Sequence, residues 1–118
     1  MMFVAVASAQ SVRDQLSGSW INEGQQVEYH FQEDGHLEFV QNGMSVMVNE
    51  YSLEEGEELH KLVFTMSMGP QTMEIPALLK VVSKDEIWIE QFAPGVTLPD
   101  AFSEEAYKKH VLHRQKQD

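Results

Sequence analysis

Methionine and histidine are the residue types in this chain that suggest a metal site, because the sequence contains no cysteine. Met66 and Met68 are one residue apart, and Met73 and His60 lie near them in the sequence. Thioether sulfurs combined with an imidazole suit Cu(I). Met66 and Met68 flank a turn at Gly69-Pro70, however, where exposed methionines are common, so we do not predict a copper site.

Zinc is the second metal to consider, and it needs three or four ligands that converge. The histidines available for it are His30, His36, His60, His110 and His113. His110 and His113 would share a face of a helix but point to opposite faces of a strand. His30 and His36 flank one expected hairpin and could meet across it. Exposed strand histidines are the simpler interpretation, and we predict no metal and no cofactor.

The residues that could carry catalysis form no recognisable constellation. The carboxylates occur in runs at Glu54–Glu58 and Glu104-Glu105, which are typical of solvated loops. No Asp and Glu are paired in an apolar setting that would prepare them for acid–base work. The serines lie in no Gly-x-Ser-x-Gly turn, and no glycine-rich phosphate loop is present. We therefore predict that the protein is not an enzyme.

Length and charge limit the fold and the partners. A chain of 118 residues with 42% apolar residues is ordinary for one globular domain. Nineteen acidic residues against eight Lys and Arg give a net charge of −11. This balance argues against nucleic acid and anionic membranes as partners, because both need a cationic face. No run of about 18 apolar residues is present, so we predict no membrane span.

The first ten residues resemble the end of a secretory signal peptide. The stretch Met1–Ala7 is apolar, and Ala7-Ser8-Ala9 has the small-x-small pattern of a cleavage site. We therefore predict that residues 1–9 are the remnant of a signal peptide and that residues 10–118 form a single periplasmic or secreted domain. The alternative is an ordinary N-terminus of a cytoplasmic protein.

The elements that must position any site are mostly strands. Residues 11–17 can form a short helix, with Val12 and Leu16 on one face. From Trp20 onward apolar and polar residues alternate, as in half-buried strands. Asp34-Gly35 and Asn42-Gly43 are strong hairpin signals. Pro76 indicates a bent strand, an edge, or two short pieces.

These patterns predict an all-β fold with eight strands and a short N-terminal helix. The expected strands begin at Gly18, Val27, His36, Met44, Leu59, Thr72, Ile87 and Lys108. Short connections force sequential strands to pair antiparallel, which gives an up-and-down meander. Eight strands are enough for the meander to close into a barrel without exposed edges.

Four segments carry a resemblance to a known family. The first is Leu16-Ser17-Gly18-Ser19-Trp20, in which Gly-x-Trp begins the first strand, and the second is the hairpin from Tyr29 to Gly35. The third is the late turn from Ser83 to Ile89, and the fourth is Arg114 near the end of the chain. Together, in this order, they resemble the lipocalin-like (calycin) domains in their small bacterial form. The resemblance implies a barrel in which Arg114 packs across Trp20, next to Gly18, and closes one end. It also implies a small ligand cavity.

Aromatic and methionine side chains are the candidates for lining such a cavity. The residues that we predict at the pocket are Tyr29, Phe31, Phe39, Met47, Tyr51, Phe64, Met66, Met73 and Trp88. Flexible thioethers suit adaptable cavities, and Tyr29 and Tyr51 would supply oriented hydroxyl groups. The simpler alternative is that these side chains fill a solid core together with Trp20.

The leading hypothesis for the function is a non-enzymatic module that binds a small apolar or amphipathic molecule. Its net charge of −11 disfavours an anionic fatty acid unless Arg114 or Arg13 meets it, so a neutral or cationic ligand fits better. The alternative is a solid barrel whose exposed surface binds a protein partner. A third class, a heme or isomerase enzyme on a calycin fold, finds no supporting residues here.

Overall fold

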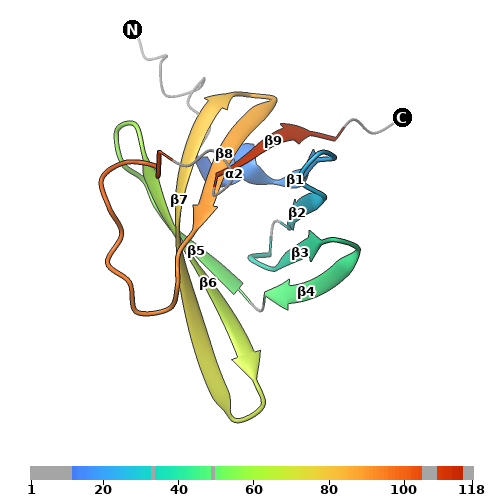
Figure 1. Ribbon diagram of the computed structural model, residues 1–118, viewed down its shortest axis with the longest axis vertical. Coiled ribbons are helices and arrows are strands. Elements are labelled where there is room, and N and C mark those ends of the chain that lie inside the picture. The colour runs from blue at the N-terminus through green and yellow to red at the C-terminus, as the bar shows by residue number, and fades with distance from the viewer. Residues whose placement is uncertain (1–11, 33, 49, 105–108, 116–118) are drawn as a thin grey trace, which may run out of the picture.

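The computed structural model describes residues 12–32, 34–48, 50–104 and 109–115, without the side chains of Met47 and Met68. The predicted remnant of a signal peptide at residues 1–9 lies outside the described residues. Within them the chain forms one short helix and nine strands (Figure 1). The elements are α2 (Val12–Leu16), β1 (Gly18–Asn22), β2 (Val27–Phe31), β3 (Leu37–Gln41), β4 (Met44–Val48), β5 (Glu50–Glu54), β6 (His60–Met68), β7 (Gln71–Ser83), β8 (Glu86–Gln91) and β9 (His110–Arg114). No helix in this part of the chain is long and apolar enough to cross a membrane.

All nine strands belong to one antiparallel sheet. Their order is β4-β3-β2-β1-β9-β8-β7-β6-β5, so the first strand pairs with the last. Other neighbours follow one another along the chain. Short turns return the backbone beside the strand it has just left, except between β8, which ends at Gln91, and β9, which begins at His110. The prediction of an all-β antiparallel fold with one short helix is therefore confirmed.

The prediction of a closed, eight-stranded barrel is wrong. The segment Met44–Leu53, expected as one strand, forms β4 and β5, which lie at the two opposite edges of the sheet. The residue between them is asparagine, a type that is depleted in strands. β4 and β6 contact each other without backbone pairing. The sheet consequently curls into an open half-barrel with a seam between β4 and β6 (Figure 1).

Local sequence signals account for two features of this sheet. Asn42 and Gly43 have φ values of 54° and 81°, the left-handed pair of a type I′ turn, and they join β3 to β4 as predicted. Pro76 lies inside β7, which remains a single strand of 13 residues. The ladder between β7 and β8 begins one residue later, at Ala77, so Pro76 lies where a missing N–H is tolerated.

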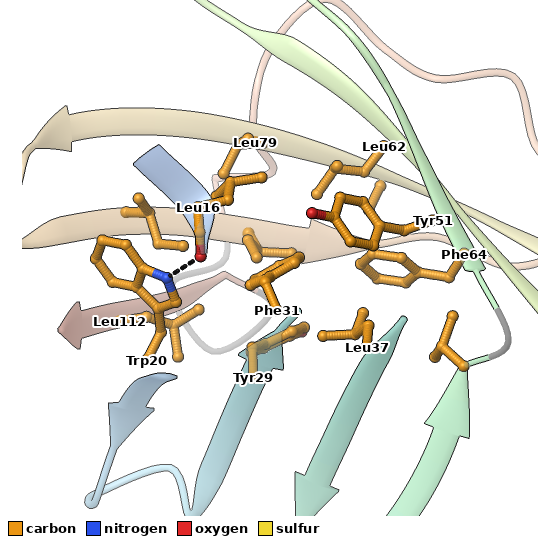
Figure 2. Packing of buried hydrophobic residues seen from close by; sticks show 14 of the residues in the cluster. Leu16, Trp20, Tyr29, Phe31, Leu37, Tyr51, Leu62, Phe64, Leu79 and Leu112 are labelled. Carbon is orange, nitrogen blue, oxygen red and sulfur yellow. Dashed lines mark hydrogen bonds between the residues drawn. The ribbon is translucent and has the colours of Figure 1, made fainter. Parts of the chain in front are cut away.

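One apolar core fills the inside of the half-barrel. Every second residue of β2 is buried, as the alternating sequence predicts. Figure 2 shows Leu16 of α2 and Trp20 of β1 at one side of this core, with Phe31, Tyr51 and Phe64 further along. The Phe31 and Tyr51 rings meet edge to face, with their centroids 5.1 Å apart. These side chains occupy the interior, and open space remains at one end and along the seam.

Candidate functional site

The end of the barrel beside α2 is closed by stacked side chains. The guanidinium carbon of Arg114 lies 4.2 Å from the centroid of the Trp20 ring, and the two residues are paired between β9 and β1. Gly18 makes room for this contact, because an added Cβ would lie 3.1 Å from Nη1 of Arg114. The structure thus brings together Gly18, Trp20 and Arg114, the three residues that the family resemblance associates with closure.

Hydrogen bonds fix the same end to the helix. The last carbonyls of a helix lack partners within it. Arg114 is the partner for two carbonyls at the end of the helix. It donates from Nη1 to the Ser17 carbonyl at 3.0 Å and from Nη2 to the Gln15 carbonyl at 2.7 Å. The Trp20 indole N–H donates to the Leu16 carbonyl at 2.8 Å (Figure 2). This end is therefore a rigid plug rather than a ligand site.

The opposite end contains a chain of partly buried polar side chains. Gln91 donates from Nε2 to the Tyr29 hydroxyl at 2.8 Å, and that hydroxyl lies 2.8 Å from Nδ1 of His110. Burial raises the pKa of Tyr29 and lowers the pKa of His110, so both groups are neutral at neutral pH. The direction of the hydrogen bond between Tyr29 and His110 depends on which ring nitrogen of His110 carries the proton.

An open cleft of about 810 Å³ borders this polar chain at Gln91 and His110. Its walls come from the end of β3, the end of β8, the start of β9 and the loop that follows β8. Aromatic side chains line it at Phe39, Phe92 and Phe102. Its polar lining includes Gln91 and His110, and also Glu90 and Glu104. The cleft is thus amphipathic.

A smaller apolar recess of about 140 Å³ adjoins the cleft at the seam. It is lined by Phe39, Val46, Val48, Phe64, Met66, Ile75 and Gln91. Phe39 and Gln91 line both spaces, so the recess and the cleft share a wall. The recess exists because β4 does not pair with β6, which leaves the sheet unsealed at this point.

The predicted pocket residues fall into several places. Tyr29, Phe31, Tyr51 and Phe64 are buried in the core, where the alternative of a filled interior also placed them. Phe39, Phe64 and Met66 line the recess. Met73 pairs with Met66 but lines a separate shallow groove with Pro94 and Gly95. The side chain of Met47 lies outside the described part of the chain.

The placement of Trp88 inside the barrel is wrong. Trp88 lies between Ile87 and Ile89, whose side chains are in the core, so its own side chain is on the outer face of β8. There its ring contacts the Phe102 ring edge to face, and the ammonium of Lys109 lies 3.8 Å from the centroid of the Trp88 ring. Trp88 consequently anchors the loop after β8 instead of lining a cavity.

The metal hypotheses find no assembled ligand set in the described residues. No three His, Asp or Glu side chains among them are grouped so that they could hold an ion. His60 and Met66 lie six residues apart along β6, roughly 20 Å, so they cannot share a copper ion. His30 pairs across its hairpin with Glu38, not with His36. Within the described residues, His60 accepts a hydrogen bond from the Gly56 N–H, and His30 contacts the side chains of Ser19 and Glu28.

Sequence reasoning missed the groups that define the open end. Gln91 and Glu90 were not singled out, and His110 was considered only as a metal ligand. The available signal was the alternation of faces along a strand. On β9 His110 is two residues from the buried Leu112, so the His110 ring lies on the same, inner face. His110 pairs with Ile89, and Gln91 is two residues after Ile89 on β8. Gln91 therefore lies on the same inner face, close to His110.

Comparison of the chain with family models, with curated proteins and with solved structures found no match. The resemblance to lipocalin-like domains therefore remains a prediction from the sequence.

Proposed function

We propose that this protein binds a small amphipathic molecule, neutral or cationic, at the open end of its half-barrel. The observation that carries the proposal is the shared wall between an apolar recess and a polar cleft, formed by Phe39 and Gln91. An apolar group would occupy the recess, and the polar end would meet Gln91 and His110. No catalytic step is part of the proposal.

The size of the recess limits the apolar group. An apolar void of about 150 Å³ can hold a benzene molecule, so a recess of about 140 Å³ suits one ring or a short branched alkyl chain. Burial contributes about 0.8 kcal/mol for each CH₂ group, so five or six carbons contribute about 4–5 kcal/mol before the costs of association. We therefore expect weak to moderate affinity for simple probes.

The charge of the site disfavours an anion. The cleft lining contains no Lys or Arg in the described residues. Arg114 is engaged at the closed end, and Arg13 lies over the Tyr51 ring at 4.7 Å. The two arginines that might have met a carboxylate are thus occupied away from the cleft.

The test uses 3-phenylpropan-1-ol, whose ring matches the recess and whose hydroxyl is neutral. Binding is measured by NMR titration of the intact protein and of two variants. Val46→Phe fills the recess, because Val46 lines it while remaining 37% exposed. Val82→Phe is the matched control, since Val82 is 43% exposed and lines neither space.

We expect the intact protein and Val82→Phe to bind the alcohol with similar affinity and Val46→Phe to bind it at least tenfold more weakly. Equal binding by all three proteins would contradict the role of the recess. Absence of binding to the intact protein would contradict the proposed function.

We also propose that the domain is lipocalin-like and is exported. Both proposals are supported by sequence features, namely the four ordered segments and the pattern at residues 1–9. Mass spectrometry of protein from its native host should find Gln10 at the mature N-terminus, and an intact Met1 would contradict export.

A further inference from the structure

The cleft at the open end contains a buried carboxylate. Glu90 is only 2% exposed, and it lines the cleft from the end of β8. Its Oε1 accepts a hydrogen bond from the backbone N–H of Ser103 at 2.8 Å. A carboxylate offers about four acceptor positions. In the described part of the chain this is the one hydrogen bond that Glu90 receives, and no ion pair there includes it.

The nearest basic residue in register does not neutralise this group. Ile89 pairs with His110, so Lys109 occupies the position across from Glu90. The ammonium of Lys109 instead lies over the Trp88 ring, 3.8 Å from its centroid. Burial lowers the pKa of His110, so its imidazole adds no positive charge to the cleft at neutral pH. A charge that is removed from water without a counter-ion is unfavourable, so a cation that enters the cleft gains a strong partner.

The aromatic lining favours the same kind of ligand. Phe39, Phe92 and Phe102 line the cleft with Glu90. Aromatic faces attract organic cations, and more strongly so in sites that exclude water. Glu104, on the loop after β8, adds a second carboxylate to the lining. Carboxylates and phenyl rings together are the surroundings that an alkylammonium group prefers.

We propose that the cleft selects an organic cation, an amine that carries one ring or short alkyl group, with its ammonium against Glu90 and its apolar group against the phenyl rings that line the same cleft. This inference rests on the proposed function and narrows its ligand class. The pairing is direct: the ammonium N–H groups donate to the Glu90 carboxylate, which is acceptor-only when ionised.

The experiment compares three probes that differ only in their polar end: 3-phenylpropylamine, 3-phenylpropan-1-ol and 3-phenylpropanoate. Each is titrated into the full chain at pH 7.5 and constant ionic strength. The same titrations are made with Glu90→Gln, which keeps an oxygen for the Ser103 N–H, and with Glu54→Gln as the matched control, because Glu54 is exposed on β5 and lines neither the cleft nor the recess. Circular dichroism verifies that each variant is folded.

We expect the amine to bind the intact protein at least tenfold more tightly than the alcohol, and the carboxylate to bind least. Glu90→Gln should remove the preference for the amine while leaving the affinity for the alcohol within about twofold, and Glu54→Gln should keep the preference. If the amine and the alcohol bind the intact protein equally, the cation proposal is overturned and the proposed function stands. If no probe binds, both are overturned. Should Glu90→Gln not fold, the ratio of amine to alcohol affinity in the intact protein still decides the cation proposal.

Discussion

Replacing Arg114 by alanine tests whether the plug at the closed end holds the fold together. The Arg114 side chain is 30% exposed, yet it stacks on Trp20 and donates to three backbone carbonyls. Two of these hydrogen bonds, to Ser17 and Gln15, are partly buried, and the third, to Lys84, is exposed. The substitution removes all of these contacts at once.

The expected loss of unfolding free energy is about 2.5–4 kcal/mol. Each partly buried hydrogen bond from the guanidinium contributes about 1–1.5 kcal/mol, near the low end for a charged donor because water can reach the freed carbonyls. The stacking on Trp20 adds about 0.5–1 kcal/mol. The ion pair with Asp85, at 3.8 Å with an Asp85 side chain that is 65% exposed, adds little.

Urea denaturation followed by circular dichroism measures this loss, and thermal denaturation should show roughly 3–5 °C for each kcal/mol in a chain of this size. Arg13→Ala is the matched control. Arg13 also lies over an aromatic ring, that of Tyr51 at 4.7 Å, but it makes no hydrogen bond within the described residues, so its loss should be about 0.5–1 kcal/mol. An Arg114→Ala effect within about 0.5 kcal/mol of zero, or one equal to that of Arg13→Ala, would refute the reasoning.

Three further predictions concern single residues of the core and of the open end. Tyr29→Phe should cost about 1–3 kcal/mol, because it leaves two hydrogen-bond partners without the hydroxyl, whereas Tyr51→Phe should cost less than about 0.5 kcal/mol, because the buried Tyr51 hydroxyl has no partner in the described structure. Equal losses in denaturation experiments would contradict this difference. Burial lowers the pKa of His110 in the folded state, so the folded protein binds that proton less readily than the unfolded chain. Stability should therefore fall as the pH drops below about 6.5, by at most about 1.4 kcal/mol per pH unit, and the curve of His110→Gln should be flatter between pH 7 and 5.5. Parallel curves would show that His110 is not responsible. Gly18→Ala should destabilise the fold by more than Gly95→Ala: both positions have positive φ, but an added Cβ at residue 18 would also lie 3.1 Å from the guanidinium of the closed end, whereas residue 95 faces open space. Thermal denaturation of the two variants makes this comparison.

Turn chemistry and alternation made much of the sheet predictable. Asn42-Gly43 requires left-handed backbone at both residues, which fits a two-residue hairpin and little else. In β2 the alternating residues Val27, Tyr29 and Phe31 identify the buried face without ambiguity. The pairing of the first and last strands came instead from the family resemblance, through Trp20 and Arg114, because local periodicity carries no information on contacts between chain ends.

The open end could not be predicted in the same way. In β8 the run Ile87-Trp88-Ile89 is apolar on both faces, so its parity does not reveal which face is inside. Both faces are covered in the structure, the inner one by the core and the outer one by the loop that carries Phe102. The burial of Glu90 depends on that loop, and the course of a loop over a sheet is not encoded in periodicity.

The closed end of the half-barrel, which we expect to determine stability, is separate from the open end, where we propose binding. Arg114 and His110 lie four residues apart on β9, about 13 Å along the strand, and they share no hydrogen-bond partner. Effects at sites this far apart generally add. A variant at the closed end should therefore lower stability without changing affinity at the cleft, provided that the protein remains folded. A buried carboxylate such as Glu90 has the opposite character, since a side chain of similar size without charge would favour the fold. Its position beneath a loop, in a cleft with aromatic walls, agrees with the cation binding that we propose.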